Sequence, residues 1–202
     1  MEAMIELPSR EATEPGAAVR INGFDMAVDG WLELFDALAV GDGDAFERLW
    51  NMAADRLYAF AAWSTGEPAD AADVVAELFA RVASHGERLR QVRNPRAWLL
   101  TVTRRLCTDV ARRRARRPTH SLEEATFVAV PDTDPDRAID ARRAGTALAR
   151  LPAPQRQVLF LHVYADCTFA TIGRILGIPT FTAASRYRRA LRRLRQLLEA
   201  SP

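Results

Sequence analysis

The feature that most constrains the fold is a helix-turn-helix pattern in the last third of the sequence. A short apolar segment over 168–176 is followed by Gly177-Ile-Pro179 and by an arginine-rich segment over 180–194. Glycine and proline interrupt helical periodicity, so this order predicts a short helix, a turn and a longer helix. In such a motif the second helix enters the major groove of DNA, and its amino-terminal part contacts the bases. The pattern therefore predicts that this end of the chain reads double-stranded DNA.

Helical periodicity also dominates the sequence before this motif. Apolar residues at steps of three and four predict helices near 31–39, 44–60, 69–84, 95–117, 136–150 and 155–164. Residues 158–164 are rich in strand formers, but a single strand among helices would have no partner. We therefore expect an all-α protein of two small helical domains, joined by a flexible linker.

Helix ends and packing faces are also predicted by particular residues. Asp44, with Glu47 three residues later, is expected to form a capping box. Asn94-Pro95 has the form of a helix start, with asparagine as the cap and proline in the first turn. In the last helix the expected buried stripe is Tyr187, Leu191, Leu194 and Leu198.

Composition divides the chain into four parts. Residues 1–28 hold prolines and glycines without a sustained period and are expected to be a mobile acidic leader. A helical domain over 29–117, a linker over 118–136 and a second helical domain over 137–202 follow. The net charge is only +2, but eleven acids precede residue 48 and eleven arginines lie between Arg88 and Arg117. This asymmetry indicates a region that contacts a partner, and separate surfaces for nucleic acid.

Several classes of protein are excluded by what the sequence lacks. It has no signal peptide and no run of about 18 apolar residues, so we expect a reduced, cytoplasmic protein without membrane insertion. His85, His120 and His162 are scattered, and no metal-ligand spacing includes them. No glycine-rich phosphate loop or nucleophile signature is present, so neither a cofactor nor an enzyme activity is expected.

Taken in order, the motifs resemble a known family. The first half carries Phe46-Glu-Arg-Leu-Trp50 and Asp70-Ala-Ala-Asp73-Val-Val-Ala-Glu77-Leu-Phe79, and the second carries Ile172-Gly-Arg-Ile175-Leu-Gly177-Ile-Pro179. The chain resembles a bacterial RNA polymerase sigma factor of the extracytoplasmic function (ECF) type, with region two over 44–117 and region four over 137–198. The resemblance implies a non-enzymatic subunit that directs core RNA polymerase to promoter DNA in transcription initiation. It also implies regulation by an anti-sigma factor.

The resemblance assigns a role to each group of candidate residues. Core polymerase would bind the helix over 69–84 through Asp70, Asp73, Glu77 and Phe79. The melted minus-10 element would contact Arg88, Arg90, Arg93, Asn94, Arg96, Trp98, Arg104, Arg105, Arg112 and Arg113. The minus-35 element would be read by Thr180, Phe181, Thr182, Ser185, Arg186, Arg188 and Arg189. Arginine is the commonest reader of guanine in the major groove, which suits the last set.

The chain departs from the family at four positions, Ala72, Ala76, Phe181 and Ala184. The first two replace polar residues on the polymerase-binding helix, and the last two lie in the DNA-reading helix. Phe181 could contact a thymine methyl or pack on the turn, and packing is the favoured interpretation.

Alternative interpretations stay open at this point. The acidic face of the helix over 69–84 could simply be solvated, and the run of arginines could be a solvated helix end. Trp98 could be a core residue, which its spacing favours. The whole chain could be a helix-turn-helix regulator that does not engage polymerase, whereas a helical nuclease or hydrolase has no ligand set to support it. The helix around Trp31–Leu38 could pack on the first domain or shield a basic DNA-binding face.

Overall fold

The computed structural model describes residues 28–116 and 143–200, and every regular element in them is helical. The first half contains α1 (Val28–Ala39), α2 (Gly43–Thr65), α3 (Pro68–His85), the 3-10 helix η1 (Gly86–Gln91) and α4 (Pro95–Ala115). The second half contains a short helix over 143–149, then α6 (Ala153–Leu159), the π-helical turn η2 (Phe160–Tyr164), α7 (Phe169–Leu176) and α8 (Thr180–Glu199). The predicted all-α fold is confirmed, and the alternative of a strand over 158–164 is wrong.

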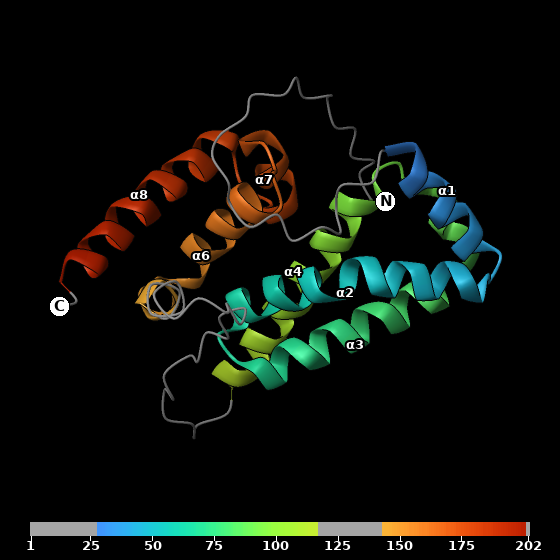
Figure 1. Cartoon of the computed structure of the whole chain (residues 1–202), viewed down its shortest axis with the longest axis horizontal. Coiled ribbons are helices and arrows are strands. Elements are labelled where there is room, and N and C mark those ends of the chain that lie inside the picture. The colour runs from blue at the N-terminus through green and yellow to red at the C-terminus, as the bar shows by residue number, and fades with distance from the viewer. Residues whose placement is uncertain (1–27, 117–142, 201–202) are drawn as a thin grey trace, which may run out of the picture.

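The helices α1 to α4 form a bundle, in which α2 packs antiparallel to α3 and both contact α4 (Figure 1). Fully buried side chains from three of the helices, including Leu57, Leu78 and Leu99, fill its centre. Burial of a leucine side chain stabilises the fold by about 1.5–3 kcal/mol, so this core holds the bundle together.

The helix α1 belongs to this bundle. Trp31, Leu34 and Phe35 are 3%, 2% and 1% exposed, and α1 packs on η1 and α2. The prediction that α1 packs on the first domain is confirmed. Its bulky apolar side chains are therefore part of the core of the first half.

Two helix starts can be compared with their predictions. At α4 the Asn94 side chain accepts a hydrogen bond from the Ala97 amide at 2.8 Å, as predicted. At α2 the prediction of a capping box formed by Asp44 and Glu47 is wrong. The cap is Asp42, whose carboxylate accepts from the Ala45 amide at 3.1 Å, and Asp44 lies within the first turn.

The buried face of α8 is also different from its prediction. Ala183, Ala190 and Leu197 are buried, with Tyr187 and Leu194 partly buried between them, whereas Leu191 is 41% exposed. The stripe is displaced because small alanines let α8 approach α6 closely, and the larger leucines end up at its edge.

The two halves pack against each other. The helix α6 contacts α2, and α7 contacts α4, so the orange and red helices lie beside the first bundle rather than apart from it (Figure 1). The predicted leader over 1–28 and linker over 118–136 lie outside the described residues, apart from Val28. The domain boundaries stay a prediction.

Candidate nucleic-acid and polymerase interface

The helix-turn-helix is built by a cap, a left-handed glycine and a close backbone approach. The Thr168 hydroxyl accepts from the Thr171 amide at 3.2 Å and starts α7. Gly177 ends that helix with φ of 65°, where a side chain would be strained. The Ile178 amide then donates to the carbonyl of Gly173 at 2.9 Å. These contacts turn the chain sharply and fix the direction of α8.

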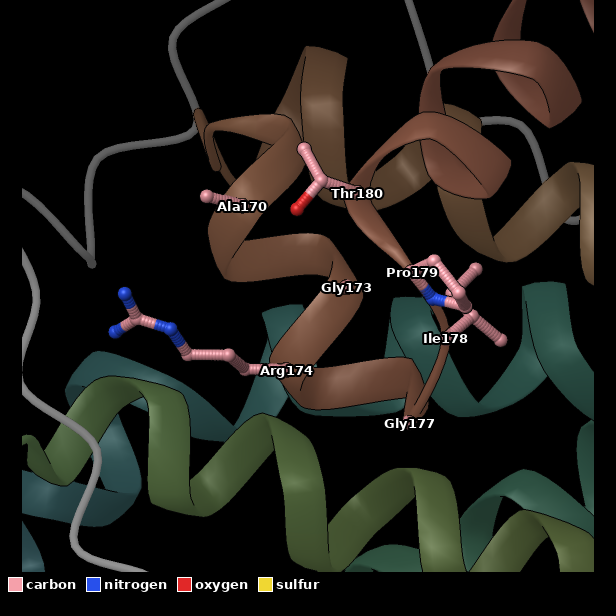
Figure 2. Close-up of a pocket in the computed structure, with 7 residues that line it drawn as sticks. All are labelled: Ala170, Gly173, Arg174, Gly177, Ile178, Pro179 and Thr180. Atoms are coloured by element: carbon pink, nitrogen blue, oxygen red, sulfur yellow. The ribbon is translucent and has the colours of Figure 1, made fainter.

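An open hollow of about 450 Å³ lies beside this turn (Figure 2). Arg174 reaches outward from α7, and the side chain of Thr180, at the start of α8, lies above it in the view. The hollow is lined by Ala170, Gly173, Arg174, Gly177, Ile178, Pro179 and Thr180. It leaves the first turn of α8 accessible, which a helix that enters a DNA groove requires.

The minus-35 candidates on α8 differ in how exposed their side chains are. Phe181 is 75% exposed, so the favoured interpretation that it packs on the turn is wrong. Thr180, Arg188 and Arg189 are also exposed, and Thr182, Ser185 and Arg186 are partly buried. Arg189 donates to the Ser185 hydroxyl at 3.3 Å, which joins two of the candidates on one face.

The polymerase-binding candidates on α3 do not form a single surface. Asp73 and Glu77 are exposed, and Glu77 pairs with Arg81 at 2.8 Å. The Asp70 carboxylate instead faces α4, where it pairs with Arg114 at 2.7 Å, and its side chain is only 19% exposed. Phe79 is 3% exposed and lies beneath another aromatic ring.

The aromatic ring that covers Phe79 belongs to Trp50, which is 45% exposed. Its centroid lies 4.6 Å from that of Phe79, and the centroid of Phe46 lies 5.8 Å from that of Phe79. Periodicity alone places Trp50 with the core residues of α2. The structure gives it an outward position at the α2–α3 surface.

The minus-10 candidates at the start of α4 differ in exposure: some are exposed, and others make contacts within the protein. Arg88, Arg90 and Arg93 are exposed, whereas Asn94 is occupied as the helix cap. The guanidinium of Arg96 donates to the Ala165 carbonyl of the second half.

Trp98 contacts Phe35 and His85, with centroid distances of 6.0 Å and 5.2 Å. It is partly buried against the core, as its spacing indicates.

Farther along α4 the arginines form a basic cluster that extends to the second half. Arg104 is partly buried, and burial, followed by the charges of Arg105, Arg112 and Arg186, lowers the pKa of its guanidinium. Arg186 belongs to α8, so candidates for the two DNA elements lie close together. Arg105, Arg112 and Arg113 are exposed.

Arg156 is a residue whose importance the sequence analysis missed. It is 7% exposed and donates through Nε to the Trp63 carbonyl at 2.6 Å and through Nη1 to the Ala149 carbonyl at 3.1 Å. One signal was available: Arg156 shares a helical face with Leu159 and Phe160, where an arginine is unusual.

Other chemistry is not supported in the part of the chain that the structure covers. No group of three or more His, Cys, Asp or Glu in residues 28–116 and 143–200 could hold a metal ion. Burial raises the pKa of Cys107 to about 12 and that of Cys167 to about 11, which suppresses their thiolates. Among the described residues, no helix is long and apolar enough to cross a membrane.

The helix-turn-helix with its exposed arginines defines an all-helical DNA-binding protein. Family models match two parts of the chain, Sigma-70 region 2 over residues 49–117 and Sigma-70, region 4 over residues 141–194. The chain belongs to the ECF family of RNA polymerase sigma factors. The resemblance inferred from the motifs is therefore confirmed, and the chain is a promoter-directing factor of transcription initiation.

Individual relatives agree with this assignment. The ECF RNA polymerase sigma factor SigL of Mycobacterium tuberculosis is 32% identical over 166 residues, which cover 80% of this chain and 93% of that protein. SigM of the same species is 30% identical, with 82% and 83% covered.

Solved structures share the fold. CnrH, solved in complex with the cytosolic domain of CnrY, has a TM-score of 0.62 and 24% identity and covers 85% of this chain and 98% of that one. The sigma factor RpoE of Bartonella quintana, solved with the anti-sigma factor NepR, has a TM-score of 0.60 and 22% identity, with 78% and 98% covered.

Proposed function

We propose that this sigma factor reads the minus-35 element with the first three turns of α8. The observation that carries the proposal is the division of this helix into a buried and an exposed face. Ala183 and Ala190 anchor it, while Phe181, Arg188 and Arg189 face outward. Arginine donates two hydrogen bonds to guanine, and an exposed phenylalanine can contact a thymine methyl. Phe181 is thus a reader of bases in this proposal.

The partner of α3 is core RNA polymerase, and Asp73 and Glu77 are the acids that contact it. Both are exposed on one side of α3 and can accept charge-assisted hydrogen bonds from basic side chains. Asp70 has a different role in this proposal. Its ion pair with Arg114 holds the end of α4 against the start of α3.

An apolar contact compensates for the two missing polar residues of α3. Ala72 and Ala76 are exposed on the helix that also carries Asp73 and Glu77, and Trp50 stands beside it on the ring of Phe79. A rigid, half-exposed tryptophan rimmed by charge is typical of residues that dominate binding energy. Trp50 is therefore part of the polymerase-binding surface.

The minus-10 element is held by exposed arginines that precede α4 or lie along it. Arg88, Arg90 and Arg93 come from η1 and the following turn, and Arg105, Arg112 and Arg113 come from α4. Contacts of this kind hold the phosphate backbone of the melted strand. Asn94 and Trp98 position this surface by capping and packing α4, rather than by contacting DNA.

Regulation by an anti-sigma factor in the cytoplasm completes the proposal. The sigma factor RpoE of Bartonella quintana, which shares this fold, was solved with the anti-sigma factor NepR, and this supports an equivalent partner here. An RNA polymerase subunit acts where the chromosome is, which supports the cytoplasmic location.

A pull-down with core RNA polymerase tests the proposal. Asp73→Arg should reduce the retained protein at least about tenfold, because a buried like-charge contact costs several kcal/mol. Asp36→Arg reverses an exposed acid of α1 and serves as the matched control, with retention unchanged. Undiminished binding of the Asp73→Arg protein would favour a helix-turn-helix regulator that does not engage polymerase.

A further inference from the structure

The helix-turn-helix is held together at a second place, at the end of α7 opposite its turn. Three rings meet there: His162 of η2, Phe169 at the start of α7 and Tyr187 of α8. The His162 centroid lies 4.4 Å from that of Phe169, with the rings stacked, and 4.6 Å from that of Tyr187, edge to face. The centroids of Phe169 and Tyr187 are 5.5 Å apart. Each ring of this aromatic triangle therefore contacts the other two.

A hydrogen bond fixes the orientation of the His162 ring. Its Nδ1 atom lies 3.0 Å from the carbonyl oxygen of Cys167. A carbonyl oxygen only accepts, so Nδ1 carries the hydrogen and donates it. The Cys167 amide in turn donates to the Leu161 carbonyl at 2.8 Å, and Cys167 is 7% exposed. The ring is thus tied to a buried part of the backbone just before α7.

The backbone between η2 and α7 brings these residues together. The Ala165 amide donates to the Phe160 carbonyl, five residues earlier, at 3.0 Å, which is the wide hydrogen bond of a π-helix. Single π-turns are frequent at functional sites. Asp166 then has φ of 47°, a left-handed conformation that few residues other than glycine adopt. This tight reversal of the chain allows Phe169 to lie on the ring of His162.

Tyr187 is the part of the triangle that belongs to the DNA-reading helix. It lies between Arg186 and Arg188 in the sequence, two of the minus-35 candidates, and is partly buried while Arg188 is exposed. The fully buried residues of the same helix face, Ala183 and Ala190, each present only a methyl group. A methyl group makes few contacts, whereas a ring held against two other rings resists rotation of its helix. The triangle is therefore the stronger constraint on the direction in which the arginines point.

We propose that His162 is a positioning residue for promoter reading. Its ring holds Tyr187, and through Tyr187 it fixes the rotation of α8 that turns Arg188 toward the minus-35 bases. His162 does not itself contact DNA in this proposal. The inference rests on the proposed function, because it requires that α8 reads bases.

Two substitutions of His162 separate its ring from its hydrogen bond. His162→Phe keeps a ring in the triangle and removes the donor to the Cys167 carbonyl. His162→Asn removes the ring and keeps a donor nitrogen at the same number of bonds from Cα as Nδ1. Val163→Ala is the matched control, because this neighbour is 53% exposed and lies outside the triangle. Circular dichroism of each full-length variant verifies that its helices are intact.

The measured quantity is the ratio of affinities for a duplex with the minus-35 element and for a scrambled duplex, determined by fluorescence anisotropy. We expect His162→Asn to lower this ratio about tenfold, as the misplacement of one arginine–guanine contact would. Its affinity for the scrambled duplex should not change, because phosphate contacts tolerate a small rotation of the helix. His162→Phe should keep the ratio within about twofold of the wild-type value, although it unfolds more easily because a buried carbonyl loses its donor. Val163→Ala should leave the ratio and the stability unchanged.

A merely structural role for His162 predicts the opposite pattern. Loss of folded protein lowers the affinity for both duplexes equally, so an unchanged ratio for His162→Asn overturns the proposal. So does a His162→Phe protein whose ratio falls as far as that of His162→Asn, because the hydrogen bond rather than the ring would then be responsible.

Tyr187→Leu tests the same triangle from the side of α8. Leucine keeps an apolar side chain at this position but removes the ring, so the ratio should again fall about tenfold. A Tyr187→Leu protein with the wild-type ratio overturns the proposal even where His162→Asn does not fold. A wild-type protein that binds both duplexes equally is a separate result, which contradicts the proposed function and with it this inference.

Discussion

At the scale of one residue, Gly173 marks a position where the helix-turn-helix has no room for a side chain. A Cβ atom added there would lie 2.7 Å from the Ile178 carbonyl oxygen, a backbone atom that cannot move alone. Gly173→Ala should therefore lower the free energy of unfolding by about 1–3 kcal/mol, as overpacking does elsewhere. Urea unfolding followed by circular dichroism measures the change.

Gly43→Ala is the matched control for this substitution. Gly43 opens α2 with nothing within 4 Å of an added Cβ, and alanine suits a helix. We expect unchanged stability, or a gain of up to about 1 kcal/mol, because alanine restricts the unfolded chain. Equal losses from both substitutions would mean that the close approach at Ile178 is not a constraint.

Single residues show where sequence reasoning succeeds and fails. Asn94 and Trp98 were predictable, because a cap and a four-residue apolar step depend on near neighbours in the sequence. Arg156 was not, because its carbonyl partner at Trp63 is 93 residues away. The half-exposed position of Trp50 was not predictable for a related reason: periodicity identifies an apolar face but does not show how far a neighbouring helix covers it.

At the scale of one helix, the start of α2 distinguishes two nearby acids. Asp42→Ala removes the side chain that accepts from the Ala45 amide, and should cost about 0.5–2 kcal/mol of unfolding free energy. Asp44→Ala should cost less than about 0.5 kcal/mol, because an exposed acid in the first turn only interacts with the helix dipole. The reverse order in thermal or urea unfolding would restore the capping box predicted from sequence.

The reading end of α8 is tested by binding to promoter fragments. Arg188→Ala and Phe181→Ala should each cost about 1–3 kcal/mol of binding free energy if these exposed side chains contact bases. Leu191→Ala is the control on the same helix, since that leucine is 41% exposed and lies beyond the first three turns. Fluorescence anisotropy with intact and scrambled minus-35 duplexes separates base reading from phosphate contact. An equal loss on both duplexes would show that these residues only position the helix.

The helices themselves were largely predictable, but their packing faces were not. Every predicted helix with described residues is present, because apolar periodicity is a local signal. The stripe of α8 was displaced toward Ala183 and Ala190, since alanine contributes little to a hydrophobic pattern yet permits the closest approach to α6.

At the scale of the whole molecule, the sequence predicted two helical domains but not their contact. Phe60 and Trp63 of α2 pack on Phe160, about 100 positions later, and no periodic signal spans that separation. The packing of the two halves is a tertiary feature that local sequence patterns do not encode.

Reconstituted transcription tests most directly the claim that this chain directs polymerase to promoters through both halves. Core RNA polymerase and the purified chain are incubated with genomic fragments, and start sites are mapped. We predict discrete start sites that require the chain, share an upstream and a downstream element, and disappear with Asp73→Arg. Start sites that are unchanged without the chain, or that persist with Asp73→Arg, would contradict the account.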